Sequence, residues 1–92
     1  MISAEVIKGV QELLVERGVQ QRQDERLGDF VARGLGITSA QAEALLASLH
    51  DGAEVDQAVM AGGIDRNAVN EDLLVHLARV IGSAAGRVAG KK

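Results

Sequence analysis

Cysteine is absent from the 92 residues of this chain, and Phe30 is its only aromatic residue. Without cysteine the chain forms no disulfide and offers no thiolate to a metal ion, which fits a reducing compartment such as the cytoplasm. With one aromatic side chain, the core must be built from aliphatic residues of small and medium size. Such cores are often marginally stable, and many small chains increase their buried area by forming dimers.

Long apolar runs are also missing. The most apolar stretch, residues 73–85, is interrupted by His76 and Arg79, and no run approaches the ~18 apolar residues of a membrane span. The first residues contain no basic group followed by an apolar stretch, so we expect no secretory signal. The sequence therefore predicts a cytoplasmic protein that does not enter a membrane.

Charge is unevenly distributed along the chain, whose net charge is −3. Residues 38–65 contain five acidic residues and no Lys or Arg, whereas residues 66–92 contain five basic and two acidic residues. Two explanations are open. The pattern can arise by chance on a small solvated surface, or the acidic middle of one subunit meets the basic C-terminal part of another.

The chain does contain regularly spaced helix signals. Capping residues and glycines divide it into five segments, each with apolar residues at helical spacing. Thr38 followed by Gln41 predicts a capping box, Gly36 predicts a helix end, and Asp65 is the predicted cap of the last and longest helix. The five predicted helices begin after Ser3, cover about residues 21–33, run from Thr38 to His50, cover about residues 54–61, and begin at Asp65.

These signals predict an all-α fold, a small bundle of about five helices over residues 1–88 with orthogonal or helix-turn-helix-like packing. Residues 89–92 are predicted to be a frayed basic tail, because Gly82, Gly86 and Gly90 each weaken a helix by roughly 1 kcal/mol relative to Ala. The alternative for these glycines is a ridge of small residues that lets another helix approach closely.

Residues suited to catalysis are few. His50 and His76 lie on different predicted helices, and neither has a His or Cys neighbour at a spacing typical of a metal site. The hydroxyl residues lack the context of an activated nucleophile. Asp24, Glu25 and Asp29 are explained as acidic residues near a helix start. We therefore expect a protein without catalytic activity, cofactor or metal.

One short segment resembles the helix-turn-helix of DNA-binding regulators. In residues 55–69 a short apolar helix and a turn at Gly63 precede a second predicted helix. Arg66, Asn67 and Asn70 are then candidate contacts to nucleic acid, because Arg and Asn side chains hydrogen bond to guanine and adenine edges. The acidic segment before them, and the two acidic residues after Asn70, disfavour phosphate binding.

The last predicted helix carries apolar residues on two adjoining faces. Leu73 and Leu77 belong to one face, and Leu74, Ile81 and Ala85 belong to the other. If one face completes the subunit's own core, the second is free for a partner. We therefore predict a small protein–protein interaction module that forms a homodimer or binds another protein through Leu74, Ile81 and Ala85. The alternatives are a compact monomer whose last helix is buried all round, and a helix-turn-helix nucleic-acid-binding protein.

Overall fold

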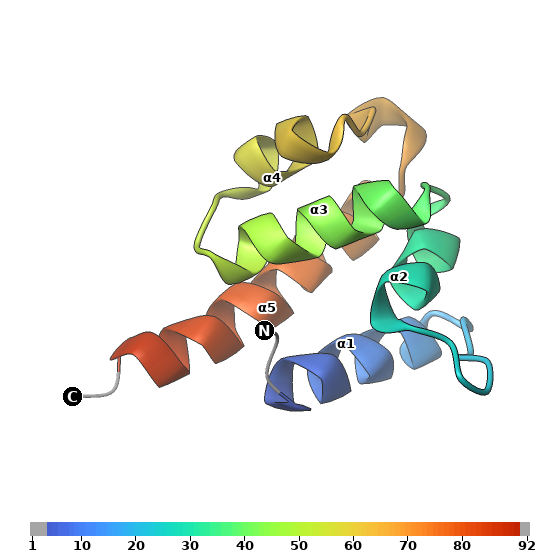
Figure 1. Cartoon of the computed structure of the whole chain (residues 1–92), viewed down its shortest axis with the longest axis horizontal. Helices are drawn as coiled ribbons and strands as arrows, with labels where there is room; N and C mark the ends of the chain where they lie inside the picture. The colour runs from blue at the N-terminus through green and yellow to red at the C-terminus, as the bar shows by residue number, and fades with distance from the viewer. Residues whose placement is uncertain (1–3, 91–92) are drawn as a thin grey trace.

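The computed structural model describes the backbone of residues 4–90 and the side chains of residues 4–82. Over this range it confirms the predicted all-α fold, with five α-helices, one 3₁₀ helix and no strand (Figure 1). None of the described helices is long and apolar enough to cross a bilayer. The elements in chain order are α1 (Ala4–Glu16), α2 (Leu27–Leu35), α3 (Ser39–His50), α4 (Val55–Gly62), η1 (Arg66–Ala68) and α5 (Glu71–Gly90).

Helix α3 lies at the centre of the molecule. It packs against α4 on one side and against α5 on the other, while α1 lies alongside α5 (Figure 1). Helix α2 crosses one end and contacts both α1 and α3. The core enclosed by these helices is aliphatic apart from Phe30, as the composition predicts. Its largest fully buried side chains are Phe30, Leu14, Leu45, Leu74, Leu77, Ile81, Val6, Val10 and Val31.

Helix α3 begins at the predicted capping box. The backbone N–H of Gln41 donates to Oγ1 of Thr38 at 3.1 Å, and the backbone N–H of Thr38 donates to Oε1 of Gln41 at 3.0 Å. Nε2 of Gln41 also donates to the carbonyl oxygen of Gly63 at 3.0 Å. Because Gly63 directly follows α4, the Gln41 side chain fixes both the start of α3 and the end of α4.

Helix α2 begins at Leu27 rather than at Gln21, so this predicted helix start was wrong. The preceding residues form a loop in which Asp24 adopts the left-handed conformation, with a φ of 63°. A residue in that conformation interrupts a right-handed helix. Nε2 of Gln21 donates to the carbonyl oxygen of Glu25 at 2.7 Å, a bond that closes the loop on itself.

An ion pair holds this loop against α2. Arg33 donates from Nε to Oε2 of Glu25 at 2.8 Å and from Nη2 to Oε1 at 2.7 Å. The same Nη2 donates to the carbonyl oxygen of Gln20 at 2.6 Å. The hydrogen bonds from Arg33, together with one from the backbone N–H of Arg22, lower the pKa of Glu25 to about 2. Glu25 therefore anchors a loop instead of starting a helix.

Helix α5 begins at Glu71, and Asp65 is not its cap. Asp65 accepts a hydrogen bond from the backbone N–H of Asn67 at 3.0 Å and so caps the 3₁₀ helix η1. The chain then becomes extended for one residue, and Oδ1 of Asn70 accepts from the backbone N–H of Leu73 at 3.2 Å. Asp and Asn are both good N-caps, so the sequence is compatible with a helix start at Asp65 or at Asn70. In the structure Asp65 caps η1 and Asn70 caps α5.

Helices α1 and α5 approach each other closely. A Cβ atom on Gly9 would lie 2.7 Å from Cγ1 of Val80, which is too short for two carbon atoms, so the absence of a side chain permits this packing. Directly after α1, Nη2 of Arg17 lies 2.6 Å from Oδ2 of Asp72 and 3.4 Å from Nδ1 of His76. These contacts join the first helix to the last along its length.

Candidate interaction surfaces

The residues predicted to form a subunit interface do not share an exposed face. Leu74 and Ile81 are both 0% exposed and belong to the subunit's own core. They are covered because α5 packs against α1, α3 and α4, so the two apolar faces expected from the sequence form one wide buried face. The side chain of Ala85 lies outside the described residues, as do residues 91–92 of the predicted tail 89–92, whereas the backbone of residues 89–90 belongs to α5. An interface through Leu74 and Ile81 would require the core to open.

A different face of α5 remains uncovered. Val75, Ala78, Arg79 and Gly82 have the spacing i, i+3, i+4 and i+7, so they form one stripe along the helix. Val75 and Ala78 are half-buried, whereas Arg79 and Gly82 are exposed. A Cβ atom on Gly82 would meet nothing within 4 Å. The backbone of α5 is therefore directly accessible at this position.

This stripe forms one wall of a groove of about 490 Å³, called here the α4–α5 groove. The other wall comes from the end of α3, the turn that follows it and the start of α4. Half-buried Val55 of α4 contributes an apolar side chain to this wall. A concave and mainly apolar surface of this kind is typical of a binding site. The lining residues are Leu49, Gly52, Ala53, Glu54, Val55, Val75, Ala78, Arg79 and Gly82.

Two charged residues line the α4–α5 groove, Glu54 immediately before α4 and Arg79 on α5. Within the part of the chain whose side chains are described, neither forms an ion pair. Arg17 and Arg33, by contrast, are each paired with a carboxylate of the same subunit. The groove thus carries one charge of each sign without an ion pair, and Glu54 also takes part in the capping box with Gln57 at the start of α4.

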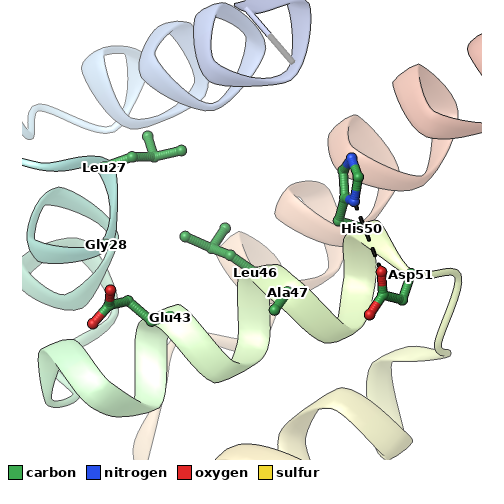
Figure 2. A pocket seen from close by; sticks show the side chains of 7 residues that line it. All are labelled: Leu27, Gly28, Glu43, Leu46, Ala47, His50 and Asp51. Carbon is green, nitrogen blue, oxygen red and sulfur yellow. Dashed lines mark ion pairs between the residues drawn. The ribbon is translucent and has the colours of Figure 1, made fainter. Parts of the chain in front are cut away.

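A second groove of about 450 Å³, the α2–α3 groove, lies between the start of α2 and the outer face of α3. Figure 2 shows the side chains of Leu27 and Leu46 extending into the gap between these helices, with Glu43 beside α2. His50 and Asp51 stand at the C-terminal end of α3, where Nδ1 of His50 is 3.9 Å from Oδ1 of Asp51.

The polar groups of the α2–α3 groove are widely spaced. The separation of 3.9 Å between His50 and Asp51 is longer than a hydrogen bond, and Glu43 lies two helical turns before His50. Among residues 4–82, no group of three or more His, Asp and Glu side chains is arranged to hold a metal ion.

The candidate nucleic-acid contacts lie before α5 rather than on it. Arg66 and Asn67 belong to η1, and Asn70 caps α5. The guanidinium of Arg66 is held between two carboxylates, Asp56 of α4 and Glu71 of α5, with 2.9 Å between Nη2 and Oε1 of Glu71. A recognition helix reads bases from its first turns, and the first turn of α5 is acidic. This geometry differs from the one expected for residues 55–69.

Comparison with known proteins gives this chain no family. No protein-family model, no curated protein and no solved structure matches it.

Proposed function

We propose that this chain is a small non-catalytic interaction module that forms a homodimer through the α4–α5 groove. The observation that carries the proposal is the uncovered stripe of α5, with Val75 and Ala78 half-buried opposite Val55. Covering such side chains removes more apolar surface from water, and small domains gain most from it because their own core is limited. The predicted role of α5 in self-association is retained, on a face different from the one predicted.

The groove suits a helical partner. At Gly82 nothing lies within 4 Å of a Cβ position, so the backbone of another helix can approach α5 there at short range. A glycine inside a helix costs about 1 kcal/mol relative to Ala, and contact with a partner offsets this cost. Ala78 and Val75, one and two turns earlier, supply apolar contacts along the same line.

Sedimentation equilibrium tests the proposal. The wild-type chain should show a dimeric mass at high micromolar concentration. Gly82→Gln should shift the chain to a monomer, because its long polar side chain would occupy the space left for a partner. Ala61→Gln, at an exposed position of α4 outside the groove, should dimerise like the wild type. A wild-type chain that stays monomeric refutes self-association. A Gly82→Gln variant that is fully dimeric shows that the interface does not include the α4–α5 groove.

The alternative expectation, a helix-turn-helix protein that binds nucleic acid, is separated from this proposal by a titration with duplex DNA at low salt. Binding that weakens with salt would support the alternative, since phosphate neutralisation dominates DNA affinity. Our proposal predicts no binding, because the Arg66 guanidinium is already paired with Asp56 and Glu71.

A further inference from the structure

We propose that the α4–α5 groove is self-complementary, so that Glu54 of one copy pairs with Arg79 of the second copy and Arg79 pairs with the second Glu54. This inference rests on the proposed function, because it requires that the groove joins two copies of the chain. The pairing of Glu54 with Arg79 would fix the orientation of the two subunits and the specificity of the dimer.

Covering the α4–α5 groove has an electrostatic cost. Any partner that covers Val55, Val75 and Ala78 also shields the two charges beside them from water. Removing an unpaired charge from water is costly unless an opposite charge meets it. Glu54 and Arg79 lack an ion pair among the described side chains of their own subunit. An occupant that brings one cation and one carboxylate would meet both charges.

The positions of the two charges in the groove are compatible with a two-fold symmetric dimer. A two-fold axis places the same patch of two subunits face to face, so a contact between one pair of residues occurs twice. The two charges of this groove come from different walls, Glu54 from the start of α4 and Arg79 from α5. A second copy that approaches along a two-fold axis can bring its Arg79 to Glu54 and its Glu54 to Arg79. It thereby meets both requirements without any other protein.

The surface between Glu54 and Arg79 is mainly apolar. Apolar residues of both walls separate them, and Gly82 leaves the α5 backbone open on the same face. Two α5 helices can then pack across the axis, with the charged pairs at the edges of the apolar contact. Paired charges at the edge of an interface select the partner and fix its orientation.

Charge reversal tests the pairing. Arg79→Glu alone gives like charges across the axis twice, and so does Glu54→Arg alone. Each variant should therefore dimerise on the order of tenfold or more weakly than the wild type, because like charges opposed across an interface are strongly unfavourable. An equimolar mixture of the two variants should recover the dimer, since both pairs of the mixed dimer carry opposite charges. Lys8→Glu, at an exposed position of α1, is the matched control and should dimerise like the wild type.

Sedimentation equilibrium of the separate variants and of their mixture decides the outcome. Circular dichroism and thermal melting verify that each variant is folded, Glu54→Arg in particular, because Glu54 takes part in the capping box of α4. Recovery of the dimer only in the mixture supports the inference. A wild-type dimer that both single variants preserve overturns the pairing while leaving self-association intact, and so does a mixture that stays monomeric. A wild-type monomer at high micromolar concentration overturns the proposed function itself.

Discussion

Arg33 binds the carboxylate of Glu25 at two points, with Nε 2.8 Å from Oε2 and Nη2 2.7 Å from Oε1. These hydrogen bonds hold the pKa of Glu25 at about 2, compared with 4.5 for an unperturbed glutamate. Between these two values the unfolded chain binds the proton more readily than the folded chain. The stabilisation that the ion pair provides is therefore fully present above about pH 4.5 and is lost as the pH falls toward 2.

Replacing Glu25 with Gln should remove this part of the pH dependence. Above pH 5 the variant should have a lower urea midpoint than the wild type, and the difference should shrink steadily as the pH falls toward about 2. Urea unfolding followed by circular dichroism at several pH values measures it. Glu12→Gln, which removes an exposed carboxylate of α1, should leave the difference from wild type nearly constant. If the urea midpoints of Glu25→Gln and of the wild type change with pH by the same amount, the ion pair with Arg33 is not the source of this pH dependence.

The Thr38 cap provides a second prediction. Thr38→Ala should lower the free energy of unfolding by about 0.5–2 kcal/mol, because the N–H of Gln41 loses the oxygen that accepts its hydrogen bond. Thr38→Ser keeps an oxygen at the same position and should recover most of the stability. Thermal or urea unfolding of the three proteins gives the comparison. Equal stabilities for the Ala and Ser variants would show that the hydroxyl plays no part.

The start of α3 could be predicted from sequence because all of its determinants are local. Thr38 and Gln41 are three residues apart and satisfy each other's backbone N–H groups. The start of α2 could not be predicted in this way. There the decisive contacts join Arg33 of α2 to Glu25 and Gln20 of the loop, and no spacing rule reveals contacts between a helix and the loop before it.

Asn70 and Asp65 should differ in importance. Asn70→Ala should reduce the free energy of unfolding by about 0.5–2 kcal/mol, because it removes the cap of α5. Asp65→Ala should cost less, since the element that it caps, Arg66–Ala68, has only three residues. Unfolding midpoints of both variants under the same conditions provide the test. A larger loss for Asp65→Ala would restore Asp65 as the principal cap.

The burial of Ile81 leads to a prediction about the core. Ile81→Asp should abolish cooperative folding, because it places a carboxylate at a position that is 0% exposed. Met60→Asp introduces the same group at a position that is 79% exposed and should leave the helical signal unchanged. Circular dichroism and thermal melting distinguish the two variants. A folded Ile81→Asp monomer would instead place Ile81 on the surface, as the sequence predicted.

The candidate surface shows a similar division between what sequence reveals and what it does not. The helical spacing of Val75, Ala78 and Gly82 is visible in the sequence. The interface was nevertheless predicted at Leu74 and Ile81, because their side chains are larger and more apolar. Which face of a helix is buried depends on where the other helices of the fold pack against it. Helix α5 contacts α1, α3 and α4. These contacts depend on the fold of the whole chain and cannot be predicted from the sequence of α5 alone.

Two glycines should respond in opposite ways to the same substitution. Gly82→Ala should raise the free energy of unfolding of the monomer by roughly 0.5–1 kcal/mol, because helix propensity improves and the new methyl group meets nothing. Gly9→Ala should be less stable than the wild type, because its methyl group would lie 2.7 Å from Val80. Urea unfolding at low protein concentration, where association is negligible, measures both. Equal gains at the two positions would contradict the close approach of α1 and α5.

The pattern of contacts along the chain also sets an order of events during folding. The hydrogen bond from Gln41 to Gly63 closes a segment whose ends are 22 residues apart, whereas the contact of Arg17 with His76 spans 59 residues. Closing a longer loop costs more entropy and slows the rate of contact formation. Helices α3 and α4 should therefore associate early in refolding, and α1 should dock against α5 late.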